Sequence, residues 1–252
     1  MEFAADSLVG KFVEKCEKFY DENKLIIDNK PFLDGYGSAK SIVKGLKRIQ
    51  EADIGGIFGI TEEYVFPIQI MEDGDAYLRE LGLEKNNYIT VHRGWDSTYK
   101  EGNVKGWSLE SCGDLIEKIK EAYPQIKVVV IGSSREQAPD TSHADIDLVG
   151  ATTLEQVKVL LKYARIHIDN EGGMVHLRYA LHGGTSIVLF GPTSVELFGY
   201  STNINLTSGV CGMWCEWMAP EWPYKCPKCE KGALCMETIT TQMIIDEIEK
   251  IL

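Results

Sequence analysis

A glycine pair between an acid and a histidine is the clearest candidate for chemistry in this sequence. The predicted strand 165–169 is followed by Glu171, Gly172, Gly173 and His176, where a helical pattern begins. The glycines let a ligand approach the backbone, and the free amides of a helix start favour an anion by roughly 0.3–1 kcal/mol. Glu171 can accept hydrogen bonds from ribose or sugar hydroxyls. The pattern favours a phosphorylated ligand, with a plain helix start and a packed histidine as the alternative.

A second turn of the same kind follows the apolar run 185–190. It contains Gly191, Pro192 and Thr193. A Gly–Pro step is a strong turn signal, and proline suits the first position of a helix. We therefore expect a second cradle for an anion at the end of a strand, with an ordinary turn as the alternative.

Two cations, Arg93 and Lys105, lie in the loop after residues 88–92. Cations are the minority in this chain, which has 26 Lys and Arg against 38 Asp and Glu. Beside a strand end they would neutralise a diphosphate and stabilise it as it departs. A solvated, charged loop is the alternative interpretation.

The composition limits the class of protein. The chain has 252 residues, of which 44% are hydrophobic and 25% charged, as expected of a globular protein with a sizeable core. Its formal net charge of -12 disfavours nucleic acid or an anionic membrane surface as the main partner. Without a transmembrane run or a secretory signal, we expect a cytoplasmic protein, with association with the inner face of the membrane left open.

The hydrophobic pattern beyond residue 86 predicts strands that alternate with helices. The predicted strands cover 88–92, 126–132, 145–150, 165–169 and 185–191. The predicted helices cover 108–123, 154–164, 175–181 and 239–252, and Ser108 and Thr153 would cap the first two. We therefore predict an α/β fold with a Rossmann-like parallel sheet, helices on both faces, and ligands at the carboxyl ends of the strands. The weaker pattern before residue 86 indicates helices at 5–23 and 39–50 and a strand at 25–28.

Five of the seven cysteines crowd into a cysteine-rich insert at residues 211–235. They are Cys211, Cys215, Cys226, Cys229 and Cys235. The spacing of Cys226 and Cys229 is that of a metal knuckle, and Cys211 and Cys215 offer a second pair. Four thiolates would hold a structural zinc or iron ion, which leaves one of the two outermost cysteines unused. Disulfides and free thiols are the alternatives, and a reducing compartment disfavours disulfides.

The order of four segments resembles the C-terminal half of glycosyltransferase family nine, the bacterial heptosyltransferase family. The segments are HRG…KGW (92–107), VVVIGSSRE (128–136), IDNEGGMVHLRYAL (168–181) and VLFGPTS (188–194), followed by the cysteine-rich insert. The resemblance covers roughly residues 62–252. It implies a GT-B fold and transfer of a heptose from an ADP-linked donor to a hydroxyl, with inversion. It also implies a role in the biosynthesis of lipopolysaccharide or another cell-surface glycan, or in protein glycosylation.

The resemblance implies roles for individual residues. Lys105 is similar to the family lysine that contacts the donor phosphate. The segment from Glu171 to His176 matches the family's acidic–small–Gly–x–x–His segment at the nucleotide sugar, and the turn at Gly191 matches its Gly-Pro-Thr turn. Family members usually have Asp where this chain has Glu171, and Ser or Thr where it has Gly172. A longer acid beside a smaller neighbour would change which sugar hydroxyls are bound.

The N-terminal part departs from the family, whose members are similar in having a full acceptor domain with a catalytic Asp near its start. We predict that residues 1–86 are a reduced or partial acceptor-side region and that residues 87–252 are the nucleotide-sugar domain. Asp34, in a glycine-containing loop, is the candidate base, with an ordinary turn aspartate as the alternative. A second subunit, a homo-oligomer and a nucleotide-sugar-binding partner that has lost catalysis stay open as alternatives.

Displacement at an anomeric carbon needs a base for the acceptor proton and positive charge for the departing diphosphate. No Asp-x-Asp motif follows a predicted strand, so we expect protein cations to replace a catalytic Mg²⁺. The acceptor would be a glycan, a lipid-linked sugar or a protein. Autotransporter heptosyltransferases are similar in binding iron through C-terminal cysteines, which keeps iron open beside zinc. An unrelated metal-stapled interaction module, built on the tryptophan-rich insert, is a further hypothesis.

Overall fold

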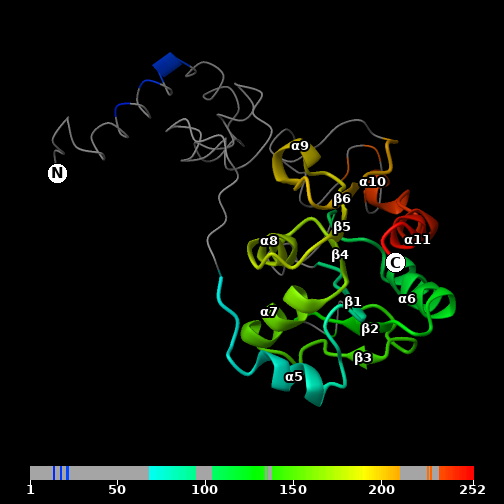
Figure 1. The fold of residues 1–252 in the computed structure, drawn as a ribbon. Helices are drawn as coiled ribbons and strands as arrows, with labels where there is room; N and C mark the ends of the chain where they lie inside the picture. Colours follow the sequence, from blue (N-terminus) through cyan, green and yellow to red (C-terminus); the bar gives the residue numbers. More distant parts are fainter. Residues whose placement is uncertain are drawn as a thin grey trace.

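The computed structural model of the chain describes residues 14, 18, 21, 22, 68–94, 104–133, 135, 138–210, 226, 228 and 233–252 (Figure 1). Six strands in these residues form one sheet in the order β3-β2-β1-β4-β5-β6, and all neighbours are parallel. The strands are β1 (Tyr88–Val91), β2 (Lys127–Val130), β3 (Ile146–Asp147), β4 (Ile166–Asn170), β5 (Ser186–Leu189) and β6 (Ile204–Leu206). The predicted parallel α/β sheet is thereby confirmed.

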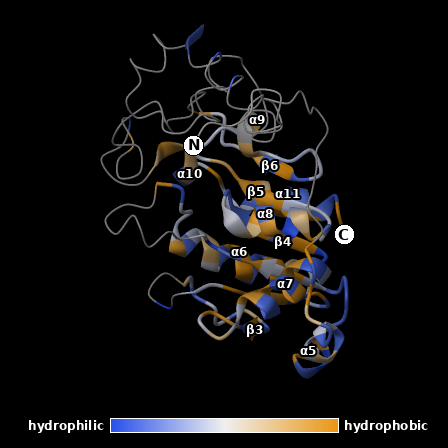
Figure 2. Cartoon of the chain, turned by 90° about the vertical axis from the view of Figure 1, so that its left-hand side faces the viewer, coloured by the Kyte–Doolittle hydropathy of each residue, from blue (hydrophilic) through white to orange (hydrophobic). Residues whose placement is uncertain are grey.

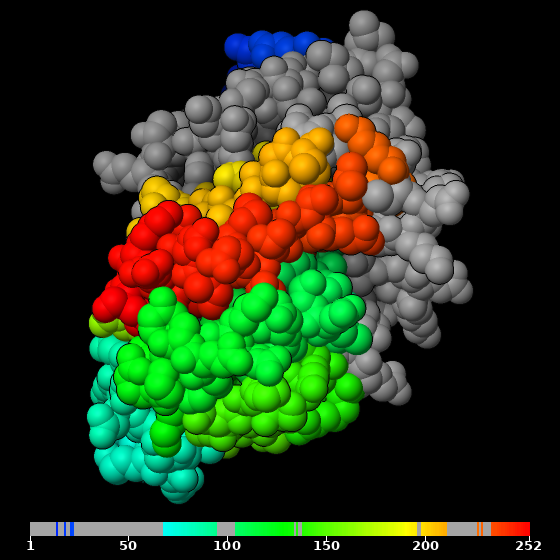
Figure 3. Space-filling view, turned by 90° about the vertical axis from the view of Figure 1, so that its right-hand side faces the viewer, coloured from blue at the N-terminus to red at the C-terminus, as the bar shows by residue number. Residues whose placement is uncertain are grey.

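Helices cover both faces of the sheet, as the sequence predicts (Figure 1). One face carries α5 (Gly74–Glu80), α7 (Leu154–Tyr163) and α8 (Gly173–Ala180). The other carries α6 (Leu109–Ala122) and α11 (Thr241–Glu249), which pack side by side (Figure 3). The short helices are α9 (Val195–Phe198) and α10 (Leu234–Glu237). Apolar side chains from the strands and both helical layers form two main cores, which Figure 2 shows as hydrophobic strands between amphipathic helices.

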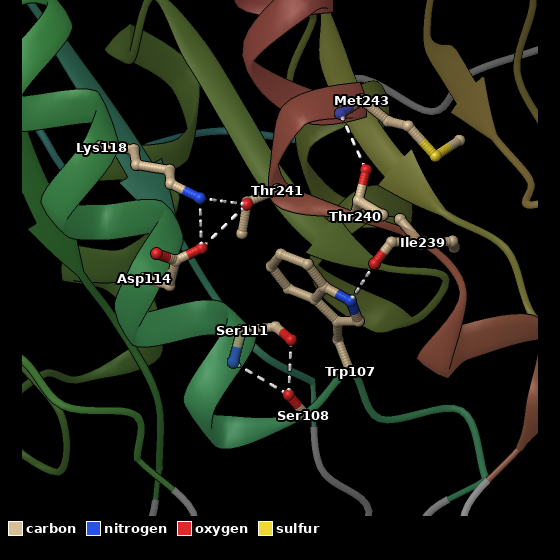
Figure 4. Close-up of polar contacts among 9 residues, drawn as sticks. All are labelled: Trp107, Ser108, Ser111, Asp114, Lys118, Ile239, Thr240, Thr241 and Met243. Carbon is tan, nitrogen blue, oxygen red and sulfur yellow. Dashed lines mark hydrogen bonds and ion pairs between the residues drawn. The ribbon is translucent and has the colours of Figure 1, made fainter.

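The predicted helix starts are confirmed by their caps. Ser108 Oγ accepts a hydrogen bond from the Ser111 amide at 2.9 Å (Figure 4). Thr153 and Gln156 form a reciprocal capping box at the start of α7. Such caps satisfy amide groups that have no partner inside the helix, and each is worth about 1 kcal/mol.

The structure differs from the prediction in several short elements. The predicted strand at 145–150 is reduced to β3, because Asp147 binds the Thr141 hydroxyl and the Val149 amide and the chain then turns at Gly150 with a φ of +70°. The elements α5, α9, α10 and β6 were not predicted, since three to seven residues are too few for a clear periodicity. The predicted elements before residue 68 lie outside the described residues, apart from helical residues 14, 18, 21 and 22.

The strand order changes direction between β1 and β4, which is where a sheet of this kind is expected to bind its ligand. The chain runs outward from β1 through β2 to β3, and in the opposite direction from β4 through β5 to β6. The loops that follow β1 and β4 therefore diverge, and doubly wound sheets bind ligands in the crevice that this leaves at the carboxyl ends of the strands. The loops that begin at His92 and Glu171 meet at this switch point.

Candidate functional site

Glu171, directly after β4, is the centre of the candidate site. Lys105 Nζ lies 2.6 Å from its Oε2, and His176 Nε2 lies 3.5 Å from its Oε1. Burial raises the pKa of the Glu171 carboxyl, but the hydrogen bond from His176 and the charge of Lys105 outweigh burial and lower that pKa overall. The structure thus brings together three predicted site residues from separate segments, as a buried carboxylate between a cation and an imidazole.

Tyr200, which the sequence interpretation missed, orients His176. The Tyr200 hydroxyl lies 2.8 Å from Nδ1 of His176, and the Tyr200 ring stacks on Tyr179 with the ring centroids 3.6 Å apart. A hydroxyl that donates to Nδ1 leaves the imidazole proton on Nε2, which faces Glu171. This contact joins α8 to a residue just after α9, and no local sequence pattern reports such a pairing.

Arg93, the second predicted cation, has a positioning contact. Its Nε donates to the Trp107 carbonyl at 2.6 Å, and the Trp107 indole in turn donates to the Ile239 carbonyl at 2.9 Å (Figure 4). Trp107 is buried and lies two residues after Lys105. Burial lowers the pKa of the Arg93 guanidinium. Trp107 is thus bonded both to the loop after β1, through Arg93, and to the C-terminal segment, through Ile239. These two bonds hold the turn that carries Lys105 in place.

The glycine pair before α8 leaves open space at the helix start. A Cβ on Gly173 would meet no described atom within 4 Å, and a Cβ on Gly172 would have the Asn170 carbonyl oxygen as its nearest neighbour at 3.9 Å. Gly172 precedes the first residue of α8, where amide groups have no helical acceptor. The described neighbours thus leave the helix start accessible, as the prediction of an anion cradle requires.

The turn at Gly191 is crowded by the C-terminal segment. A Cβ on Gly191 would lie 2.5 Å from the Met236 sulfur and 3.4 Å from the Cys235 sulfur. Pro192 and Thr193 are buried, and Thr193 Oγ1 has no hydrogen-bond partner among the described residues. A larger residue than glycine at this turn would collide with α10. This packing alone explains the glycine, independently of any ligand that the turn binds.

A second buried carboxylate, Asp169, was also missed by the sequence interpretation. Its Oδ2 lies 2.9 Å from His92 Nδ1 and 3.4 Å from His167 Nε2, and His167 Nδ1 lies 3.0 Å from Thr90 Oγ1. The signal was present as polar residues at every second position, Thr90 and His92 on one strand and His167, Asp169 and Glu171 on the other. Alternate residues of a strand share a face, so these side chains form one row.

Other predicted site residues are only partly described. Asp34, Cys211, Cys215 and Cys229 lie outside the described residues. Cys226 is buried, and its sulfur accepts a hydrogen bond from the Lys228 amide at 3.4 Å. In the portion of the chain that the structure describes, no three His, Cys, Asp or Glu side chains gather as a metal site. None of the described helices has the length and hydropathy needed to cross a membrane.

Comparison with known proteins gives one family match. The sequence model of glycosyltransferase family 9 (heptosyltransferase) matches residues 89–228. No curated protein is similar enough in sequence to count as a match.

Several solved structures share the fold. The E. coli ADP-heptose lps heptosyltransferase II has 18% identity over 73% of this chain and 53% of its own, with a TM-score of 0.53. A family 9 glycosyltransferase from Veillonella parvula has 17% identity over 79% and 58%, with a TM-score of 0.54. The iron-containing dodecameric glycosyltransferase TibC from enterotoxigenic E. coli has 15% identity over 81% and 52%, with a TM-score of 0.57. This chain thus spans little more than half the length of these structures.

Proposed function

This chain belongs to glycosyltransferase family 9, and from that premise we propose that it moves a heptose-like sugar from an ADP-linked donor to an acceptor hydroxyl, with inversion. The observation that carries the proposal is the meeting of Lys105, Glu171 and His176 at the switch point of the sheet. One neighbour in fold is named for its ADP-heptose chemistry, which supports the choice of donor.

The contacts suggest how a donor would be held. Lys105 and the open start of α8 would bind the diphosphate and stabilise it as it departs. A phosphate that takes over Lys105 would release Glu171 from its ion pair, and the carboxylate could then accept hydrogen bonds from the sugar hydroxyls. Inversion requires one direct displacement, with a base for the acceptor proton; Asp34 remains our candidate for that base.

We extend the proposal to the organisation of the protein. Residues 87–252 would form the nucleotide-sugar domain, and residues 1–86, a second subunit or another copy of the chain would supply the acceptor side. The acceptor would be a glycan, a lipid-linked sugar or a protein. The transfer would take place in the cytoplasm or at the inner face of the membrane, in cell-surface glycan synthesis or protein glycosylation. The dodecameric state named for TibC is the ground for including another copy.

We expect ADP-heptose to raise the melting temperature of the full chain more than UDP- or GDP-sugars do. A ligand at 100 times its Kd stabilises the folded state by about 2.7 kcal/mol. Since each kcal/mol shifts the melting temperature by about 2–4 °C at this size, we expect a shift of about 5–11 °C. Thermal-shift measurements over the donor panel, followed by detection of released ADP, separate binding from turnover. Binding without turnover would favour the partner-subunit alternative, and no stabilisation by any nucleotide sugar would contradict the proposed function.

We also propose a structural zinc or iron ion held by four of the five cysteines of the insert. The buried Cys226 fits this role, because an amide hydrogen bond to its sulfur from two residues onward would stabilise a thiolate ligand. The metal would stabilise the fold of the insert in place of a hydrophobic core. It would thereby also support the contact of Met236 with the turn at Gly191.

Protein purified without added metal should contain about one equivalent of zinc or iron per chain, measured by elemental analysis. Cys226→Ser should lower that content, whereas Cys112→Ala should leave it unchanged, because Cys112 is a buried core residue on α6 and is not one of the five cysteines of the insert. Well-folded protein with neither metal would exclude the proposed site.

A further inference from the structure

A row of polar side chains crosses the otherwise apolar centre of the sheet. Thr90 of β1 is in register with His167 of β4, and the His92 amide continues the ladder by donating to the Ile168 carbonyl at 2.9 Å. His92 is thereby placed opposite Asp169. The hydrogen bonds and ion pairs described above join four side chains of the row, those of Thr90, His167, Asp169 and His92. The row ends at the carboxyl ends of β1 and β4, at the switch point of the sheet.

Asp169 is costly to bury, since its side chain is only 1% exposed. A buried carboxylate costs several kcal/mol unless a cation and hydrogen bonds compensate. Burial lowers the pKa of His167 despite its contact with Asp169, so His167 is neutral at neutral pH. His92 is therefore the group in the row that can balance the charge of Asp169.

His92 is also the member of the row that reaches the site. Its side chain is 19% exposed, whereas those of His167 and Asp169 are buried. Nδ1 of His92 binds Asp169, and the structure shows no hydrogen bond from Nε2 to the part of the chain that it describes. The next residue, Arg93, binds the carbonyl of Trp107 in the Lys105 turn. The second ring nitrogen of this partly exposed side chain thus has no partner among the described residues.

The strand end holds this loop in place. Asn170 Nδ2 donates to the Arg93 carbonyl, and a Cβ on Gly94 would lie 3.1 Å from Asp169 Oδ1. Gly94 has a φ of +56°, so a side chain there would be strained as well as crowded. The end of β4 therefore holds the backbone directly after His92, which limits how far its ring can move.

We propose that His92 is a further donor-binding residue, which Asp169 holds by Nδ1 so that its Nε2–H donates to the diphosphate of the nucleotide sugar. The inference rests on the proposed function, and it adds a residue to that site. A charged hydrogen bond to a phosphate oxygen is about twice as strong as a neutral one, so the contact would contribute to affinity mainly while His92 is protonated.

The proposal gives a pH dependence with a definite sign. Burial lowers the pKa of His92, but the charge and hydrogen bond of Asp169 outweigh burial and raise the pKa overall. His92 therefore stays protonated to a higher pH than an ordinary histidine, and donor affinity should fall as pH rises through its pKa. The other ionisable groups around the pair are His167 on β4, Arg178 on α8, Cys112 on α6 and Arg93 on the same loop.

The test combines NMR with binding measurements on the full chain. Histidine labelled with ¹³C at Cε1 gives one signal for each of the five histidines, and His92→Gln assigns that of His92. Titration between about pH 5.5 and about pH 9 should show a raised pKa for His92 in the wild type and a lower one in Asp169→Asn. ADP-heptose should shift the His92 signal and should bind about tenfold more weakly above this pKa than below it. The diphosphate of ADP-heptose does not itself titrate in this range.

The variants distinguish the outcomes. His92→Gln should remove the pH dependence of binding, whereas His143→Gln, on an exposed histidine 3.6 Å from Glu117, should keep it. If His92→Gln misfolds, substitution of each of the four other histidines assigns the His92 signal by elimination, so the wild-type titration still decides the result. ADP-heptose that binds without moving the His92 signal would overturn this inference alone. Failure of the wild type to bind at any pH would instead overturn the proposed function.

Discussion

Lys105→Ala is expected to slow the release of ADP from ADP-heptose by about 100- to 1,000-fold in kcat/KM. The side chain is the cation that touches Glu171 at the centre of the site, and a charge that meets the departing diphosphate acts most strongly in the transition state. The loss should therefore fall on kcat as well as on KM. Initial rates of ADP release, measured over a range of donor concentrations, give both constants.

The control for Lys105→Ala must separate chemistry from folding. The substitution removes the cation that helps to lower the pKa of Glu171, so the buried carboxyl would take up a proton at a higher pH and some stability would be lost near neutral pH. Lys105→Gln keeps most of the side chain and should lose activity to a similar extent. Lys250→Ala, at an exposed ion pair on the far end of α11, should retain full activity. Equal losses at both lysines would contradict the assigned role.

The elements that the sequence predicts well are those with strong local causes. The run at β2 is β-branched and bounded by glycine, and its residues Val128, Val129 and Val130 are all buried. Ser108 and Thr153 cap their helices because a hydroxyl at that position satisfies a free amide wherever the helix packs. Strands and helix starts of this kind depend little on distant residues, and the parallel order follows from their alternation.

The site was only partly predictable, because its pairings depend on strand register. Lys105, Glu171 and His176 came from the order of the motifs, and the structure places them together. The ion pair of His92 with Asp169 arises only when β1 lies beside β4, which the separate strands do not reveal. Polar residues at alternate positions of two otherwise apolar strands were the available signal, and they indicate one polar face at the strand ends.

Arg178→Met is expected to lower the free energy of unfolding by about 3–5 kcal/mol, since a buried group that loses its hydrogen-bond partner costs about 1–3 kcal/mol. Arg178 is fully buried on α8 and donates to three carbonyl oxygens, those of Leu161, Ala164 and Thr185. Burial lowers the pKa of Arg178 to about 10, so the side chain is charged at neutral pH. Urea denaturation followed by circular dichroism, with an unchanged m-value, measures the effect.

The site of these bonds explains why so large an effect is expected. Leu161 and Ala164 lie at the C-terminal end of α7, where carbonyl groups lack helical partners and a cation is favoured by the helix dipole. Arg165→Met is the matched control, because its guanidinium also donates to a carbonyl, that of Ile251 at 2.9 Å, but on the surface. That substitution should cost less than about 1 kcal/mol. A similar cost at both arginines would show that water replaces Arg178 as the partner of these carbonyl groups.

Arg178→Met should also weaken donor binding, even where the protein remains folded. The substitution removes the hydrogen bonds that hold α8 to α7, and α8 carries His176 of the candidate site.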